Sequence, residues 1–372
     1  MAFKIGDVAN LSTQPPFTGT DAPLVIAQLG CGYWGPNLLR NFSALPGCHV
    51  KWVADPSAER RGYVAANFPR STPVPDWQTA LDDPAVDAVL VATPASTHYA
   101  LTKAALEAGK HVFVEKPLAM TAVEADELVA LANRTSRTLM VGHTFLYNAA
   151  VRYTKDLLDR GELGDLYYLY SQRLNLGQVR SDVNAWWNLA PHDVSIFLYL
   201  MDGALPVSVA ATGTDYIQPG VEDVVFATLT WGNRVTAHIQ VSWLDPEKVR
   251  KVTLVGSRKM VVYDDVADNK IAIVDKGIDR VPHIGERMDY DQPVTEFKLL
   301  HRTGDILLPR VPAKEPLAVE AAHFLSCVRS GQEPLSGPQH ARDVVAVLEA
   351  GQRSLKEHGR AVPVEPAGKA IR

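Results

Sequence analysis

The first half of the chain alternates short apolar runs with segments whose apolar residues recur at helical spacing. Residues 24–30 (LVIAQLG) have the pattern of a buried strand, residues 31–45 that of a helix, and residues 49–55 (HVKWVAD) that of a second strand. The alternation continues with strands predicted at 85–93, 111–114 and 138–142 and helices at 98–108 and 122–133. This order predicts a parallel sheet with helices on both faces.

The second half has runs rich in β-branched and aromatic residues, at 166–174, 224–231 and 235–243. Apolar residues alternate in the last run: Val235, Ala237, Ile239, Val241 and Trp243. This alternation predicts a half-buried strand of an antiparallel sheet. Gly232 and Asn233 precede it, and we expect them to form a two-residue hairpin turn.

The first predicted strand is followed by a glycine motif, Gly30-Cys31-Gly32-Tyr33-Trp34-Gly35. In such a motif the first glycine permits a tight turn, the second lets amides approach a pyrophosphate, and the third lets the helix pack on the strand. Asp55, 25 residues after Gly30, ends the second predicted strand, where it can accept hydrogen bonds from ribose hydroxyls and repel a 2′-phosphate. NAD is therefore the predicted cofactor. NADP is the less favoured alternative, which Arg60 and Arg61 nearby would admit.

Two further motifs follow later strands: Ala92-Thr93-Pro94 with His98, and GKHVFVEKP at 109–117. With the glycine motif, their spacing resembles the Gfo/Idh/MocA family of oxidoreductases. The resemblance implies that Lys116, of Glu-Lys-Pro, lies beside the nicotinamide and the substrate hydroxyl and assists proton transfer. The expected cofactor contacts are Gly30, Gly32, Tyr33, Trp34, Gly35, Asp55, Thr93, Pro94, His98, Glu115, Lys116 and His143.

The segment DVNAWWNLAPHDVSIFLYLM at 182–201 predicts a helix from about Leu189, capped by Asn188 and with Pro191 in its first turn. His192 would then lie near the helix N-terminus, whose positive end keeps an imidazole neutral, as a general base requires. Asn188 and His192 are one turn apart and can face one substrate. Family members that oxidise sugars usually have an aspartate at Asn188. The resemblance therefore assigns proton transfer to Lys116 and His192, with Asn188 as a hydrogen-bonding residue.

Longer stretches between Gly30 and Leu325 resemble the sugar-nucleotide 3-dehydrogenase branch of the family. The resemblance implies oxidation of the 3-hydroxyl of a UDP-hexose type substrate, feeding 3-amino sugar biosynthesis, including that of antibiotics. Arginine suits a diphosphate because its planar fork binds oxygen pairs. Arg180 has the alternative of pairing with Asp182. The candidate substrate residues are Tyr147, Arg173, Asn175, Arg180, Asn188 and His192.

The predicted fold is α/β, with two domains after a poorly ordered extension at 1–22. A Rossmann dinucleotide-binding domain spans 23–146, and a substrate-binding and oligomerisation domain spans 147–340. A helix at about 341–357 is expected to pack back on the first domain. The resemblance implies that the second domain is α+β with an open, largely antiparallel sheet, and that the protein is a homo-oligomer, a dimer or a tetramer.

The composition of the 372-residue chain excludes several classes of function. A net charge of -5 offers no basic surface for nucleic acid, and no apolar run reaches the roughly 18 residues of a membrane span. The cysteines, Cys31, Cys48 and Cys327, lack the spacing of a metal site or a disulfide framework, which favours a reducing cytoplasm and no metal.

Two alternative functions fit the same motifs. One is an NAD(P)H-dependent ketoreductase of a dTDP-keto-deoxysugar, or a dehydrogenase of a free cyclitol or aminoglycoside. The other is a dinucleotide-sensing regulator that has lost catalysis. Asp55 argues against NADPH, and the presence of both Lys116 and His192 argues against the regulator.

Overall fold

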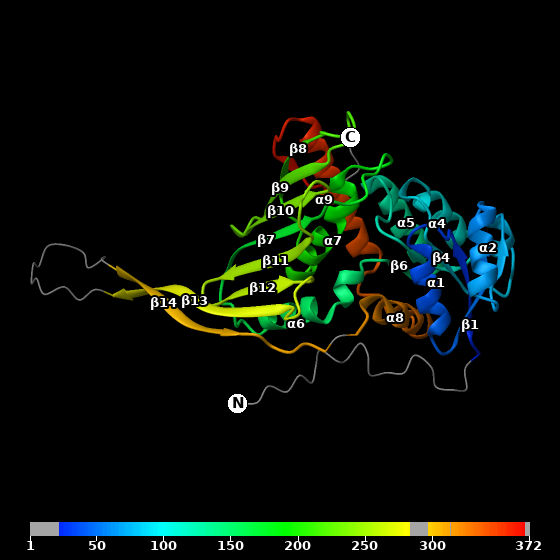
Figure 1. Cartoon of the computed structure of the whole chain (residues 1–372), viewed down its shortest axis with the longest axis horizontal. Helices are drawn as coiled ribbons and strands as arrows, with labels where there is room; N and C mark the ends of the chain where they lie inside the picture. Colours follow the sequence, from blue (N-terminus) through cyan, green and yellow to red (C-terminus); the bar gives the residue numbers. More distant parts are fainter. Residues whose placement is uncertain (1–21, 283–296, 313, 369–372) are drawn as a thin grey trace, which may run out of the picture.

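The computed structural model describes residues 22–282, 297–312 and 314–368, so almost all of the extension predicted at 1–22 lies outside the described residues. Figure 1 shows an α/β domain, drawn in blue and cyan, beside a domain built on a larger sheet, drawn in green and yellow. Helices from the end of the chain lie between them. Within the described part of the chain, no helix is both long and apolar enough to span a membrane.

The first domain contains a six-stranded parallel sheet with the order β3-β2-β1-β4-β5-β6. Its strands are β1 (Leu24–Leu29), β2 (Cys48–Ala54), β3 (Thr72–Val74), β4 (Ala88–Val91), β5 (His111–Val114) and β6 (Leu139–Val141). The helices are α1 (Gly35–Ala44), α2 (Ala58–Asn67), α3 (Gln78–Leu81), α4 (His98–Glu107) and α5 (Ala122–Thr135). The strand order reverses between β1 and β4, and such a switch point opens a ligand crevice at the carboxyl ends of the strands.

The predicted parallel sheet is confirmed, but α2, α3 and β3 had no clear signal in the sequence. Helix α2 buries only Val64, so its apolar residues show no regular helical spacing. Strand β3 has three residues, one of them Pro73, and is too short for a recognisable pattern.

The second domain contains a nine-stranded sheet with the order β14-β13-β12-β11-β7-β10-β9-β8-β15. Its strands are β7 (Leu166–Leu174), β8 (Ser208–Thr214), β9 (Val224–Thr230), β10 (Thr236–Ser242), β11 (Val249–Gly256), β12 (Met260–Asp264), β13 (Ile271–Pro282), β14 (Phe297–Leu307) and β15 (Val362–Pro363). All neighbouring pairs are antiparallel except β7 and β10, which are parallel. The prediction of a largely antiparallel sheet is therefore confirmed.

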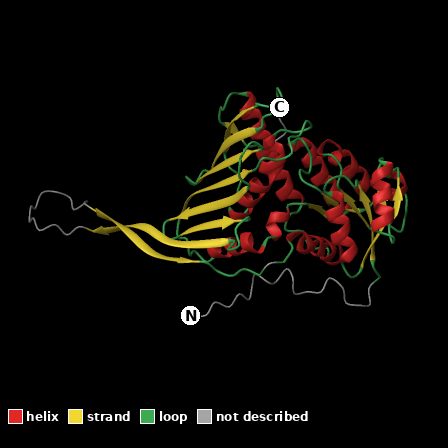
Figure 2. Cartoon of the chain, in the orientation of Figure 1, coloured by secondary structure: helices red, strands yellow, loops and turns green. Residues whose placement is uncertain are grey.

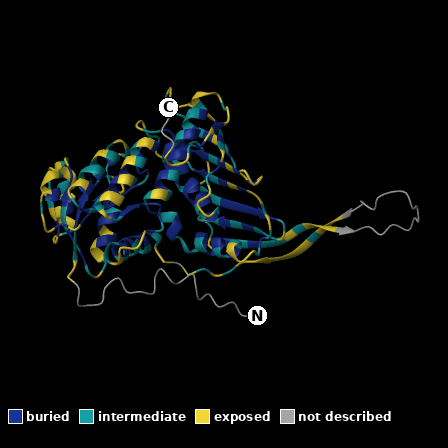
Figure 3. Ribbon diagram, turned by 180° about the vertical axis from the view of Figure 1, so that it is seen from behind, coloured by how far each residue is buried: buried dark blue, intermediate teal, exposed yellow. Residues whose placement is uncertain are grey.

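Helices cover one face of this sheet: α6 (Ala149–Asp159), α7 (Ala185–Leu200) and α9 (Pro338–Lys356). In Figure 2 they all lie on the side of the sheet toward the first domain. On β10, Ala237, Ile239 and Val241 are buried, as the alternation predicts. Figure 3 shows that β13 and β14 project from the body as a largely exposed ribbon.

The turn between β9 and β10 differs from the prediction. The amide of Trp231 donates to the carbonyl of Val235 at 2.9 Å, so three residues form the loop rather than two. Arg234 takes the left-handed conformation, with φ of 70°. A three-residue hairpin commonly ends in a residue of this conformation, and here the position is occupied by arginine instead of the glycine that would have signalled it.

Two helices from the C-terminal part of the chain pack against the first domain and connect it to the second. Helix α9 packs on α5, where Arg342 donates to both carboxylate oxygens of Asp126, at 2.7 and 3.2 Å. Helix α8 (Pro316–Ser330) packs on α1, where Arg40 pairs with Glu315. These contacts hold the carboxyl ends of the parallel strands close to α7 and β7, which carry the candidate chemistry of the second domain.

Candidate active site

The glycine turn lies between β1 and α1. Gly30 has a φ of 89°, and a Cβ atom there would lie 2.5 Å from the carbonyl oxygen of Ala92. A Cβ atom on Gly35 would lie 2.8 Å from the Gly30 oxygen, whereas one on Gly32 would meet nothing within 4 Å. Gly30 and Gly35 therefore allow close packing, and Gly32 leaves the open approach that a dinucleotide pyrophosphate needs. The residues of this turn fit NAD.

Asp55 follows β2 and holds the glycine turn in place. Its carboxylate accepts from the Cys31 amide at 2.7 Å and from the Ser57 amide at 2.9 Å. A carboxylate has about four acceptor sites, so it can still accept from a ribose hydroxyl. The Arg61 guanidinium donates to the carbonyls of Asp55 and Pro56. One of the two arginines that would admit NADP is therefore already hydrogen-bonded to the backbone.

His98 links the loops that follow β4 and β5. Its Nδ1 lies 2.7 Å from the Pro117 carbonyl and its Nε2 lies 2.9 Å from the Thr93 carbonyl. Burial lowers the pKa of this imidazole, and a neutral ring donates from only one nitrogen. His98 therefore donates to one of these carbonyls and packs against the other, between the loop that carries Lys116 and the Thr93-Pro94 loop.

A cavity of about 240 Å³, which we call the inner cavity, lies beside these loops. It brings together candidates from both domains. Those in its wall are Tyr33, Trp34, Thr93, His98, Glu115, Lys116, Arg180, Asn188 and His192.

Lys116 and Glu115 are adjacent titratable groups in this cavity. The Lys116 Nζ donates to the Asn188 carbonyl at 3.0 Å. Burial lowers the pKa of Lys116 to about 8, against the opposing effect of Glu115, and Arg173 and Arg180 lower it further. Burial also raises the pKa of Glu115 to about 7, which Lys116 opposes. An amine with such a pKa exchanges its proton close to neutral pH, as acid–base catalysis requires.

Helix α7 begins one turn earlier than predicted. Its N-cap is Asn184, whose side-chain oxygen accepts from the Trp187 amide at 3.0 Å, and Pro191 lies inside the helix. The prediction of an Asn188 cap is therefore wrong. Trp186 and Trp187 are both buried, so the first turn is held by packing that the apolar spacing did not reveal.

His192 consequently lies near the middle of α7 rather than at its N-terminus. Its pKa is nonetheless well below the usual range, because the ring is buried and because Lys116 and Arg173 add positive charge nearby. The expectation of a neutral imidazole stands, but burial is its cause instead of the helix dipole. Asn188, one turn earlier, accepts from the Trp243 indole through its side-chain oxygen at 3.2 Å.

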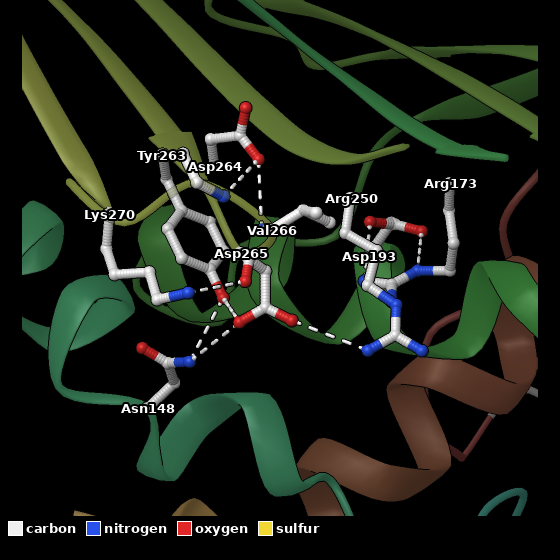
Figure 4. Close-up of polar contacts among 10 residues, drawn as sticks. Asn148, Arg173, Asp193, Arg250, Tyr263, Asp264, Asp265, Val266 and Lys270 are labelled. Carbon is white, nitrogen blue, oxygen red and sulfur yellow. Dashed lines mark hydrogen bonds and ion pairs between the residues drawn. The ribbon is translucent and has the colours of Figure 1, made fainter. Parts of the chain in front are cut away.

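A second cavity of about 430 Å³, the outer cavity, shares Trp34, Thr144 and His192 with the inner one. Its polar wall comes largely from β7, β11 and the residues around them, and Figure 4 shows Asn148, Arg173, Arg250 and Asp265 of this wall. The polar residues of this wall, apart from those shared, include Asn37, Asn148, Arg173, Asn175, Lys248, Arg250 and Asp265. The two cavities therefore meet at His192.

Both arginines predicted to bind substrate are paired with carboxylates. Arg173 is buried and donates to Asp193 at 2.8 and 3.1 Å, and its guanidinium lies 4.5 Å from the centre of the Phe145 ring. Phe145 in turn packs edge-on against His192. Arg180 donates to Asp182 at 2.8 and 2.6 Å. Each lines a cavity, but each guanidinium is already engaged.

Two other candidates lie in the interior. Tyr147 is buried, with its hydroxyl 3.0 Å from the Ser336 hydroxyl, and His143 is buried edge-on against His340. Neither residue lines the inner or the outer cavity. This placement corrects the expectation that Tyr147 contacts substrate and His143 contacts cofactor, because these two side chains turn into the interior, whereas Thr144 and Asn148 beside them line the outer cavity.

The matches to known protein families follow the two domains of the chain. A model of an oxidoreductase family with an NAD-binding Rossmann fold matches residues 24–143, and a model of the GFO/IDH/MocA C-terminal domain matches residues 151–262. The chain belongs to the Gfo/Idh/MocA oxidoreductase family. Its first domain is thus an NAD-binding Rossmann domain, and the predicted resemblance is confirmed.

Individual relatives within the Gfo/Idh/MocA family are similar over most of the chain. The UDP-N-acetylglucosamine 3-dehydrogenase of Acidithiobacillus ferrooxidans is 30% identical over 257 residues, which cover 69% of this chain and 78% of that protein. A solved structure of that enzyme has a TM-score of 0.74 at 25% identity, covering 91% of this chain and all of that chain. GenD2 from gentamicin A biosynthesis, solved in complex with NAD, shares the fold, with a TM-score of 0.76 at 22% identity over 93% of this chain and 97% of that chain.

Proposed function

We propose that this protein oxidises the 3-hydroxyl of a nucleotide-activated hexose of the UDP-sugar type to a 3-keto sugar, with NAD. The observation that carries the proposal is the meeting of Lys116 and His192 in the wall of the inner cavity, which Tyr33 and Trp34 of the glycine turn also line. The similarity to a UDP-N-acetylglucosamine 3-dehydrogenase supports the substrate class.

The proposed roles follow from the protonation of the side chains. Neutral Lys116 accepts the proton of the substrate hydroxyl, and the Asn188 carbonyl at 3.0 Å orients its Nζ. Neutral His192 holds the same hydroxyl by a hydrogen bond. NAD, when bound, accepts a hydride from the carbon that carries this hydroxyl. Asn188 can hydrogen-bond a hydroxyl through its amide but cannot take up its proton.

A panel of substrates tests this proposal. We expect UDP-hexoses to produce NADH fluorescence. A parallel assay with 2-oxoglutarate, which would reoxidise cofactor that stays bound, follows the 3-keto sugar instead of the fluorescence. Signal from free cyclitols or aminoglycosides alone would instead favour a dehydrogenase of those compounds. Tight NAD binding without signal from any sugar would favour a dinucleotide sensor. If a dTDP-linked sugar were oxidised with NADP and not with NAD, the conclusion that Asp55 selects NAD would be overturned.

The pH dependence of the reaction should follow Lys116. We expect kcat/KM for sugar oxidation to rise about tenfold per pH unit below the pKa of about 8 that burial gives Lys116, and to level off above it. The reason is that only the unprotonated amine accepts a proton. His192, with a pKa well below its usual range, adds no further limb in this interval, whereas Glu115, whose pKa burial raises to about 7, titrates beside Lys116 and makes the rise shallower near pH 7. Steady-state kinetics over the pH range measure this profile, and a flat profile would contradict the role of Lys116.

Replacing Asn188 with aspartate should move that profile to higher pH. A carboxylate in the wall of the same cavity favours the ammonium form of Lys116 and raises its pKa. The Trp243 indole can still donate to an oxygen at this position, so the local packing is retained. The same kinetics on the N188D variant test the effect, and an unchanged profile would show that residue 188 does not act on Lys116.

A further inference from the structure

We propose that Lys248 and Arg250, in the wall of the outer cavity, form the subsite for the diphosphate of the substrate. This inference rests on the proposed function, because it assigns the part of a nucleotide-activated sugar that does not react. It also replaces the expectation that Arg173 and Arg180 supply the phosphate contacts, since both are held by carboxylates.

The register of the second sheet places two arginines on one face. Strands β7 and β11 are antiparallel, and Arg250 lies directly opposite Arg173. Residues directly opposite on paired strands point to the same face. Lys248, in the loop just before β11, lines the same outer cavity as both arginines. Like charges opposite one another are destabilising unless something neutralises them.

The protein neutralises these cations unequally. Arg173 has a bidentate, buried partner in Asp193, whereas Arg250 makes one contact of 3.4 Å with Asp265. Figure 4 shows that the Asp265 carboxylate is shared: it also accepts from the Tyr263 hydroxyl at 3.0 Å and the Asn148 amide at 3.3 Å.

Lys248 is exposed and forms no ion pair with any residue that the structure describes. Among the described residues nothing compensates its charge, and the contact of Arg250 with Asp265 is the one ion pair that this arginine forms with them, which leaves other guanidinium nitrogens to donate. A planar guanidinium beside a flexible ammonium is a good match for the paired oxygens of a diphosphate.

The position of the two cations suits this ligand. The cavities meet at His192, so a sugar whose hydroxyl lies at His192 and Lys116 extends its far end into the outer cavity. The pyrophosphate of NAD is instead expected at the glycine turn, where Gly32 leaves the approach open. Lys248 and Arg250 would thus distinguish a nucleotide-activated sugar from a free sugar.

Binding of UDP to the NAD-saturated protein, measured by calorimetry, tests this subsite. The variants are K248M and R250M, and the control is K251M. Lys251 is the next residue of β11, belongs to the opposite face, and pairs with Asp264 at 3.2 Å. We expect K248M and R250M each to weaken UDP binding about tenfold or more, as loss of a hydrogen bond between charged groups does, and K251M to leave it unchanged. Binding of uridine, which lacks phosphate, should be the same in all four proteins.

The outcomes separate this inference from the proposed function. Wild-type affinity for UDP in both K248M and R250M would overturn the subsite, even if UDP-hexoses are oxidised. Equal losses of uridine and UDP binding would also overturn it, because the effect would then not concern phosphate. Loss of UDP affinity in these variants, with no oxidation of any UDP-hexose, would support the subsite and refute the proposed function. Lys248 is exposed, so K248M remains informative if R250M fails to fold.

Discussion

Lys116→Ala lowers the turnover of the sugar substrate by about 10²–10⁴-fold, the usual contribution of a general base, and leaves NAD affinity nearly unchanged. The amine whose pKa burial lowers to about 8 is then missing from the wall of the inner cavity. The glycine turn and Asp55, which we expect to hold most of the cofactor, are untouched. Steady-state kinetics and a fluorescence titration with NAD measure the two quantities separately.

Chemical rescue gives this experiment its control. A small primary amine added to the Lys116→Ala variant should restore part of the turnover, because the amine can occupy the space left by the side chain and accept the same proton. Lys103→Met, which removes a partly exposed lysine from α4, should leave turnover unchanged. Turnover of Lys116→Ala close to that of the wild type would remove Lys116 from the reaction.

Asp193→Ala destabilises the protein by about 3–5 kcal/mol, because it leaves the buried Arg173 guanidinium without its partner. Arg250, directly opposite on β11, adds to the cost, since the two cations then face each other and Arg250 has a contact of 3.4 Å with Asp265 as its one ion pair among the described residues. Chemical denaturation followed by circular dichroism measures the change in the free energy of unfolding.

Asp182→Ala is the matched comparison. It also removes the carboxylate of a bidentate arginine pair, but both side chains are about 40% exposed, at 40% for Arg180 and 44% for Asp182. We expect a loss of only about 0–1 kcal/mol there. The double variant Arg173→Met with Asp193→Leu should regain most of the stability lost in Asp193→Ala, because no unpaired buried charge remains. Equal losses in Asp193→Ala and Asp182→Ala would contradict the structural importance of the buried pair.

The parallel sheet was predictable because its signals are local. Strands buried on both faces are continuous apolar runs, and β5 was predicted at its observed bounds, His111–Val114. The glycine motif is recognisable locally too, since Gly30 has a φ of 89° and Gly35 packs on the Gly30 carbonyl, although the approach of Ala92 to Gly30 is a contact between distant segments. The bounds of α7 were harder, because its first turn is held by the buried Trp186 and by the Asn184 cap rather than by a regular apolar spacing.

Charged residues of the site were the least predictable. Arg173 and Arg180 were expected to contact substrate from their residue type, yet their partners Asp193 and Asp182 decide how far each can do so. Lys248 and Arg250 were missed altogether, although they stand two residues apart at the start of β11. Their significance depends on Arg173, which only strand pairing brings opposite Arg250.

The sequence by itself determined the family, the Rossmann domain and the pair of residues, Lys116 and His192, on which the proposed chemistry depends. These features are encoded in short motifs, whose glycine geometry and apolar periodicity act over a few residues. Only the tertiary structure decided which charges are neutralised, why His192 is neutral, and where the inner and outer cavities meet. The reason is that burial and ion pairing depend on contacts between segments far apart in the chain, and these contacts leave little trace in local residue patterns.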